Sequence, residues 1–276
     1  MEKKGQNYHM NIIDEPESKL DRLLRLASTE PAHRPEFCQH LLDSLAYVIG
    51  STGDDELGEK YLDKGSSISL QSWERPDGTS VIPFFTSLLH LQKSVETESN
   101  YLELPVRILF EMTLGSELMI NPNSEYGKEF LPDEVASLLQ NGIGQETQQR
   151  VIEHETEILI GEPDKYPSIM IDSLTTLFSK HDCVAAAYLA LIQDEGEDEV
   201  PNLIIGLQGE GDLDRVIQEA AAVAWDTTDE DEIVDFIILG EDEDDGISEY
   251  FFNESKPFYD RSWGSRLKDN TLTGKA

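Results

Sequence analysis

Apolar residues in the first half of the chain recur mainly at helical spacing, with short strand-like runs between them. A capping serine or a proline suits the first turn of each predicted helix. The predicted helices begin near Ser18, Pro35, Ser87, Pro105 and Pro132. Predicted strands cover residues 46–49, 67–73, 79–84 and 117–120, and the turn Arg75-Pro76-Asp77-Gly78 makes the middle two a hairpin. We therefore expect an α+β domain over residues 18–142, after a mobile tail of residues 1–17.

The second half alternates strands and helices more regularly. Predicted strands lie at 157–160, 184–193, 203–207 and 233–239, with helices around 170–178 and 212–223 and a short last helix around 247–251. The order β-α-β-β-α-β is typical of a split β-α-β, ferredoxin-like sandwich of two layers, here with an extra C-terminal helix. We assign this α+β domain to residues 150–264, a boundary to the polar stretch 142–149, and a polar tail to 265–276.

The strand at 184–192 is apolar on both of its faces. A strand with one wet face would alternate apolar and polar side chains, so this pattern predicts that both faces are covered. One face suits the two helices of its own domain. The sequence leaves open whether the first domain, the last helix or a second subunit covers the other.

The chain carries 56 acidic and 21 basic residues, a formal net charge of −35. Residues 194–245 hold most of the excess, with Arg215 their single base. Such a charge disfavours nucleic acid and anionic membranes as partners and favours a protein with a basic surface. The start of the chain has no apolar signal segment, and Cys38 and Cys183 suit reduced, buried thiols, so we expect a cytoplasmic protein.

Motifs that carry chemistry are missing from the sequence. We find no zinc spacing among the six histidines, no nucleophile elbow and no phosphate loop. Residues 241–246 resemble the start of a calcium loop, but the position that requires a bidentate Glu is Phe252. We therefore assign no catalytic residue, no cofactor and no metal ligand.

Two segments are unusually rich in aromatic residues for loops, residues 81–87 and 257–264. Their side chains are our candidates for a partner-binding surface: Phe84, Phe85, Phe258, Tyr259, Arg261 and Trp263. The second segment has an alternative explanation, because an apolar segment with one arginine can also dock against the protein itself.

Several stretches of the chain resemble one known family. They are EPAHRP at 30–35, DGTSVIPFFTS at 77–87, PVRILFEMTLG at 105–115, GKEF at 127–130, MIDSLTTLF at 170–178, PNLIIG at 201–206 and PFY at 257–259. In this order they resemble the N-terminal and C-terminal domains of the SseB, or enhanced serine sensitivity, family. The resemblance covers roughly residues 18–264 and implies a bacterial cytosolic protein linked to serine tolerance. It brings no accepted catalytic residue, cofactor or substrate.

Three functions remain open at this point. The first is a non-catalytic interaction or regulatory protein that acts through an unidentified cytosolic partner, in an unknown oligomeric state. The second is a regulatory protein that binds an amino acid. In the loop at 161–167, Asp164 could meet an ammonium group, and Lys165 could assist the N-terminus of the next helix in holding a carboxylate, although an ordinary connection is the favoured explanation of this loop. The third is an enzyme, which a pocket containing His33, Arg34, Arg107 or Lys128 would favour.

Overall fold

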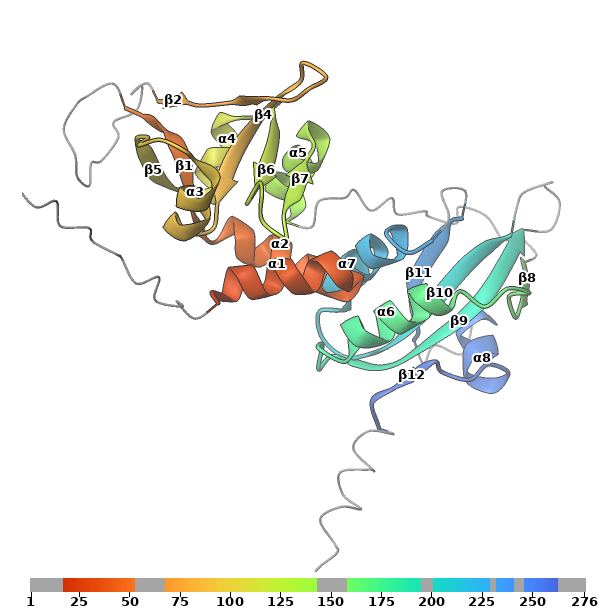
Figure 1. The fold of residues 1–276 in the computed structure, drawn as a ribbon. Coiled ribbons are helices and arrows are strands. Elements are labelled where there is room, and N and C mark those ends of the chain that lie inside the picture. Colours follow the sequence, from red (N-terminus) through yellow and green to blue (C-terminus); the bar gives the residue numbers. More distant parts are fainter. Residues whose placement is uncertain are drawn as a thin grey trace, which may run out of the picture.

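The computed structural model shows two α+β domains arranged side by side (Figure 1). It describes residues 17–52, 68–142, 158–194, 201–228, 232–240 and 246–262. Residues 143–149 of the boundary predicted at 142–149, the tail at 265–276 and residues 1–16 of the predicted N-terminal tail lie outside this part. Glu17 is described, and its carboxylate pairs with Arg25, 2.9 Å between Oε1 and Nε.

The first domain is built around one mixed sheet of short strands. Its helices are α1 (Lys19–Thr29), the 3-10 turn η1 (Pro31–His33), α2 (Arg34–Leu42), α3 (Leu88–Ser94), α4 (Val106–Met112) and α5 (Pro132–Asn141). Its strands are β1 (Leu45–Ser51), β2 (Ser69–Leu70), β3 (Trp73–Glu74), β4 (Ser80–Phe85), β5 (Tyr101–Pro105), β6 (Glu117–Ile120) and β7 (Lys128–Phe130). The predicted hairpin forms between β3 and β4, where Trp73 faces Val81.

The sheet of the first domain has the order β2-β1-β4-β6-β7, with β5 also on β1 and β3 on β4. Only the pairing of β4 with β6 is parallel among these strands. Strands β5 and β7 have no counterpart in the sequence prediction. Both are short, and their polar residues hide the alternation that would mark a strand.

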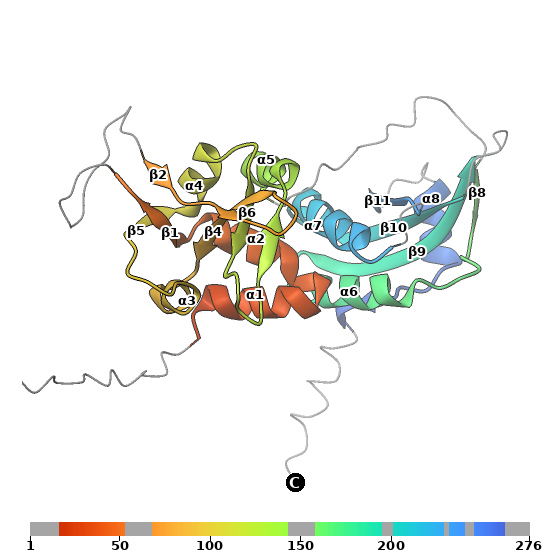
Figure 2. The same cartoon turned by 45° about the horizontal axis from the view of Figure 1, so that its top comes forward.

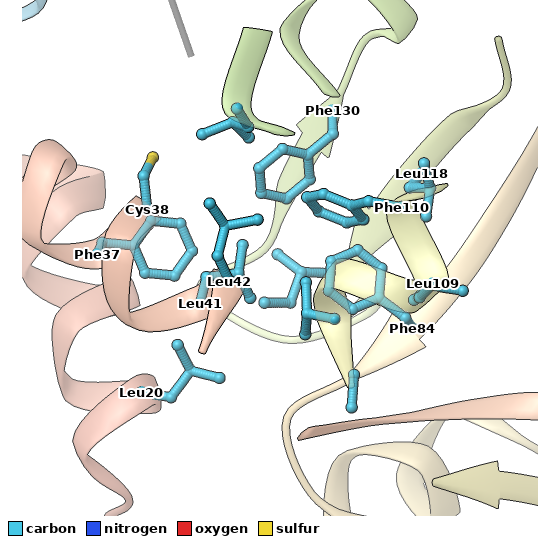
Figure 3. Close-up of a cluster of buried hydrophobic side chains, with 14 of the residues drawn as sticks. Leu20, Phe37, Cys38, Leu41, Leu42, Phe84, Leu109, Phe110, Leu118 and Phe130 are labelled. Atoms are coloured by element: carbon cyan, nitrogen blue, oxygen red, sulfur yellow. The ribbon is translucent and has the colours of Figure 1, made fainter. Parts of the chain in front are cut away.

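One core of this domain lies between the sheet and helices α1, α2, α4 and α5. Its centre is a group of three aromatic rings, Phe84, Phe110 and Phe130, with centroids 5.6–5.9 Å apart (Figure 3). Neighbouring strand residues point to opposite faces, so Phe85 enters a second, smaller core under α3 with Ile49 and Leu91. The aromatic pair of residues 84 and 85 therefore fills both faces of the sheet.

The second domain has three layers. Its helices are α6 (Ser168–Phe178), α7 (Leu213–Trp225) and α8 (Gly246–Asn253). Its strands are β8 (Ile158–Gly161), β9 (Val184–Asp194), β10 (Asn202–Gly209), β11 (Val234–Ile238) and β12 (Tyr259–Asp260). Helices α6 and α7 pack on one face of the sheet, and α8 packs on the other.

The predicted order of elements is present, but the split β-α-β arrangement is not. The sheet has the order β11-β10-β9-β12, and β8 also pairs with β9. A split β-α-β unit places a strand between two parallel ones. Here β8 is a direct, antiparallel neighbour of β9, and the parallel strands β10 and β11, joined by α7, also touch directly. The expected ferredoxin-like topology is therefore wrong, because element order does not determine which strands pair.

Both faces of β9 are covered, as its sequence predicts. Leu189 belongs to the core under α6 and α7, while Tyr188 lies in the core under α8, where its ring centroid is 5.8 Å from that of Phe251. Among the alternatives the sequence left open, the last helix is the cover. The same helix makes the expected two-layer sandwich a three-layer one.

No helix in the described ranges is long and apolar enough to cross a membrane. The two cysteines are free, with Cys38 buried and Cys183 partly exposed.

Candidate functional site

An open pocket of about 1010 Å³ lies where the first domain meets α7 of the second. Helices α1, α2 and α5 and strand β7 form most of its wall, and the second domain contributes Ala222 of α7 and Asp226, the residue directly after this helix. Both ribbon views place α2, α5 and α7 around this junction (Figure 1 and Figure 2). Pockets between domains are common places for small ligands.

The lining combines an apolar surface with paired charges. Leu24, Phe37 and Leu131 are among its apolar members. Arg34 and Lys128 supply positive charge, and the acidic lining residues are Glu129, Asp133, Glu134 and Asp226. Such a wall can bind a small molecule that carries both charges beside an apolar part.

Arg34 crosses the domain junction. It lies at the start of α2, directly after the 3-10 turn, and its Nε donates to the carbonyl of Ala27 at 3.2 Å. Its Nη1 pairs with Oδ2 of Asp226 at 2.6 Å. The guanidinium is thus held from both sides, and it forms a polar contact between the domains at the wall of the pocket.

Lys128 faces the same pocket from β7. Its Nζ pairs with Glu134 Oε1 at 2.8 Å and donates to the carbonyl of Glu129 at 3.0 Å. It also lies 4.8 Å from the centroid of the Phe130 ring, which favours a cation there. Both basic side chains of the pocket are therefore fixed in position.

The thiol of Cys38 belongs to the lining but is poorly suited to nucleophilic chemistry. Burial, with a smaller contribution from Glu134, raises its pKa to about 12. Because the thiolate is the reactive form, the thiol is inert near neutral pH.

Of the four residues whose convergence would favour an enzyme, the pocket contains Arg34 and Lys128. Arg107 lies exposed on α4, and His33 faces the second domain instead. The pocket thus brings together two binding groups. It does not supply His33 as a base.

His33 belongs to a second contact between the domains. Lys180 Nζ donates to the carbonyl of Ala32 and lies 2.8 Å from His33 Nδ1. Burial and the charge of Lys180 lower the pKa of His33, and burial lowers the pKa of Lys180. Ala32 itself is 2% exposed and packs in the core of the second domain.

A third contact surrounds Glu219, a buried carboxylate on α7. It accepts hydrogen bonds from Gln39 Nε2 at 3.1 Å and Arg215 Nε at 3.2 Å, and it pairs with His181 Nε2 at 2.9 Å. Gln39 also accepts from Arg215 at 2.6 Å. Burial alone would raise the pKa of Glu219, but the His181 hydrogen bond and charge, with help from Gln39 and Arg215, lower it. The sequence offered no signal for this contact, since its members are far apart in the chain.

The candidate partner-binding residues are mostly occupied within the protein. Phe84 and Phe85 are both 0% exposed, so assigning them to a binding surface is wrong. Their burial follows from the two cores on either side of β4.

The described part of this segment, residues 257–262, docks against β9, as the alternative explanation allowed. Phe258 and Tyr259 pack on Phe178, and the Tyr259 hydroxyl donates to its carbonyl at 3.2 Å. Arg261 donates to the carbonyls of Val184 and His181. Trp263 lies outside the described residues.

The loop before α6 shows no built ligand site. Asp164 and Lys165 are both exposed, and Pro167 precedes the helix without a capping side chain. This geometry is that of the ordinary connection that the sequence also allowed.

The segment at 81–87, most of which lies in β4, ends in a polar cluster around Thr86 at the edge of the first domain. Asn121, with a positive φ of 47°, donates from Nδ2 to Thr86 Oγ1 at 2.9 Å, and its Oδ1 accepts from the Thr86 N–H at 3.0 Å. Thr86 also contacts His90 Nδ1, and its hydroxyl donates to Asp21. These bonds tie α1, α3 and the end of β6 together. Within the described residues, no group of His, Cys, Asp and Glu is arranged to hold a metal ion.

Comparison with known proteins agrees with this architecture. The family model described as "SseB protein N-terminal domain" matches residues 20–137, and "SseB protein C-terminal domain" matches residues 152–261. Protein SseB of Escherichia coli (strain K12) and Protein SseB of Shigella flexneri are each 41% identical over 257 residues, which cover 93% of this chain and 97% of theirs. No solved structure matches significantly. With both domains matched and this identity over nearly the whole length, the chain belongs to the SseB family.

Proposed function

We propose that this chain is a cytosolic, non-catalytic regulatory protein that binds a small zwitterionic ligand, such as an amino acid, between its domains. The observation that carries the proposal is the pocket at the junction, with Arg34 and Lys128 fixed in its wall. A ligand carboxylate suits these two cations, and an ammonium group suits the acidic lining. The protonated Cys38 thiol supports binding rather than covalent chemistry.

The pocket also supports a route from binding to regulation. Arg34 joins the domains through Asp226, so a ligand carboxylate that takes the place of Asp226 on Arg34 removes one interdomain contact. The ligand then changes the free energy with which the domains associate, and a partner that contacts both domains responds to that change. The serine tolerance implied by the family resemblance would then depend on ligand binding in this pocket and on the partner protein that responds to it.

Isothermal titration with the common L-amino acids, D-serine and simple carboxylates tests the proposal. We expect at least one zwitterion to bind more tightly than about 1 mM. Arg34→Gln and Lys128→Gln should each weaken this binding about tenfold or more, because each removes a charge-assisted hydrogen bond. Arg107→Gln is the matched control, since it removes an exposed arginine of the same domain outside the pocket.

Two results would overturn the proposal. One is that no compound of the panel binds at millimolar concentration. The other is that the Arg34 and Lys128 variants bind as tightly as the Arg107 control, which would place the ligand elsewhere.

A further inference from the structure

The 3-10 turn η1 (Pro31–His33) is a part of the first domain that packs into the second. Ala32, at the centre of the turn, is 2% exposed and belongs to the core of the second domain. Its carbonyl accepts a hydrogen bond from Lys180 Nζ at 2.8 Å, and Lys180 lies two residues after the end of α6. The next side chain of the turn, His33, is therefore held directly against a cation of the other domain.

Both ring nitrogens of His33 have a partner, and the two partners determine the charge state of the ring. Nδ1 lies 2.8 Å from Lys180 Nζ, and Nε2 lies 3.2 Å from Glu30 Oε2. An ammonium group has only donors, and a carboxylate has only acceptors. Nδ1 must therefore accept from Lys180, while Nε2 carries the proton that is donated to Glu30. This contact between the domains requires a neutral ring.

A second proton on His33 reverses the contact with Lys180. The charged imidazole has an N–H on both nitrogens and no acceptor left. The new N–H would point at the Lys180 ammonium group, so one hydrogen bond is lost and two like charges meet across the domain boundary. The His33 side chain is only 16% exposed, so water screens this repulsion less than at an open surface.

The charged groups around His33 compete with one another. Glu30 and Glu36, both from the first domain, favour the charged ring, whereas burial and Lys180 oppose it and lower the pKa of His33 below 6.5. Glu219 of α7 acts on Lys180 in the same direction as the two glutamates of the first domain. The contribution of the contact is therefore fully present above pH 6.5 and is lost as the pH falls through the pKa of the docked state.

The other contacts between the domains do not contain such an arrangement. His181 pairs with Glu219 of its own domain at 2.9 Å, so a positive charge on His181 strengthens that pair. Gln39 donates to Glu219 with either charge on His181, because an amide does not titrate. The pair of Arg34 and Asp226 contains no histidine.

We propose that the contact between His33 and Lys180 is a pH-sensitive switch for the association of the two domains. Near neutral pH the ring accepts from Lys180, and η1 stays docked. In mild acid the charged ring repels Lys180, and the domains separate more often. The switch is distinct from the pocket, whose lining includes neither His33 nor Lys180, and it needs no ligand there.

Small-angle X-ray scattering of the full chain between about pH 7.5 and about pH 5, the range in which histidine titrates, tests the proposal. We expect the radius of gyration to increase as the pH falls, because separated domains occupy a longer shape than docked ones. An NMR titration of the His33 ring in the same buffers should give the same midpoint. Circular dichroism checks that each domain stays folded.

Two variants should abolish this response. His33→Gln keeps an acceptor for Lys180 and a donor for Glu30 but cannot gain a proton, and Lys180→Met removes the charge that the protonated ring would face. His90→Gln is the matched control, since His90 bonds within the polar cluster of the first domain, and it should respond as the wild type does.

A wild-type radius of gyration that does not change with pH would overturn the proposal. So would an increase of the same size in His33→Gln, because that result would assign the change to the many carboxylates of the chain. A midpoint that differs from the His33 titration would overturn it as well.

Discussion

Replacing Glu219 by alanine tests whether the two domains are joined as the structure indicates. Glu219 is 4% exposed and accepts from Gln39, Arg215 and His181. Its removal leaves three polar groups without their acceptor at a largely buried position. Breaking a buried ion pair costs about 3–5 kcal/mol.

Two of the partners reduce this cost. The side chains of His181 and Arg215 are 22% and 56% exposed, so water can hydrate them after the substitution. We therefore expect Glu219→Ala to lower the free energy of unfolding by about 2–3 kcal/mol, the range for one or two hydrogen bonds to a charged group.

Urea unfolding followed by circular dichroism measures this loss. Gln218→Ala is the matched control, because Gln218 is the exposed neighbour on the same helix and its substitution has a similar effect on helix propensity. A double-mutant cycle with Gln39→Ala then isolates the contact between domains, for which we expect a coupling of about 1 kcal/mol.

If the free energy of unfolding of Glu219→Ala lies within about 0.5 kcal/mol of that of Gln218→Ala, the usual scatter for surface substitutions, the contacts of Glu219 do not stabilise the protein as expected. A loss of unfolding free energy of the expected size, but without coupling to Gln39, would refute only the contact between the domains. In that case Glu219 stabilises only its own domain, through His181 and Arg215.

Three further predictions concern the cores of both domains and the domain junction. Tyr188→Asp and Leu189→Asp should each destabilise the protein by about 3–5 kcal/mol, because they bury an unpaired charge on opposite faces of β9; wild-type amounts of folded protein for either would show that its face is exposed. Phe84→Ala should cost about 3–5 kcal/mol in urea unfolding, since it empties the centre of the aromatic group, and a loss below about 1 kcal/mol would contradict that packing. Lys180→Met should raise the pKa of His33 in an NMR titration. In the wild type the pKa of His33 lies below its ordinary value of 6.5, so the unfolded state binds the proton more readily than the folded state. The wild-type protein therefore loses stability as the pH falls through 6.5 toward the pKa of the folded state. An unchanged His33 pKa in the variant would disprove the contact.

Most of the local elements can be read from the sequence alone. Ser18 caps α1 by accepting from the Asp21 N–H, Asp212 caps α7 in the same way, and Gly142 ends α5 with a positive φ of 78°. These features are readable in advance because capping and helix periodicity depend on residues within a turn or two of one another. The double-sided apolar pattern of β9 likewise predicted two covered faces, since each side chain's face follows from its position in the strand.

Which of these elements pack against one another depends on contacts between segments that are distant in the chain. The order of the strands in the second sheet depends on hydrogen bonds between distant segments, and the same β-α-β-β-α-β order is compatible with more than one pairing. An aromatic pair such as Phe84 and Phe85 has the same sequence pattern whether it faces solvent or two cores, so its burial required the helices on both faces of β4. Arg34 and Lys128 stood out in the sequence as single residues. Their pocket exists because packing brings α2, β7 and α7 together, and no local property of the chain encodes that arrangement.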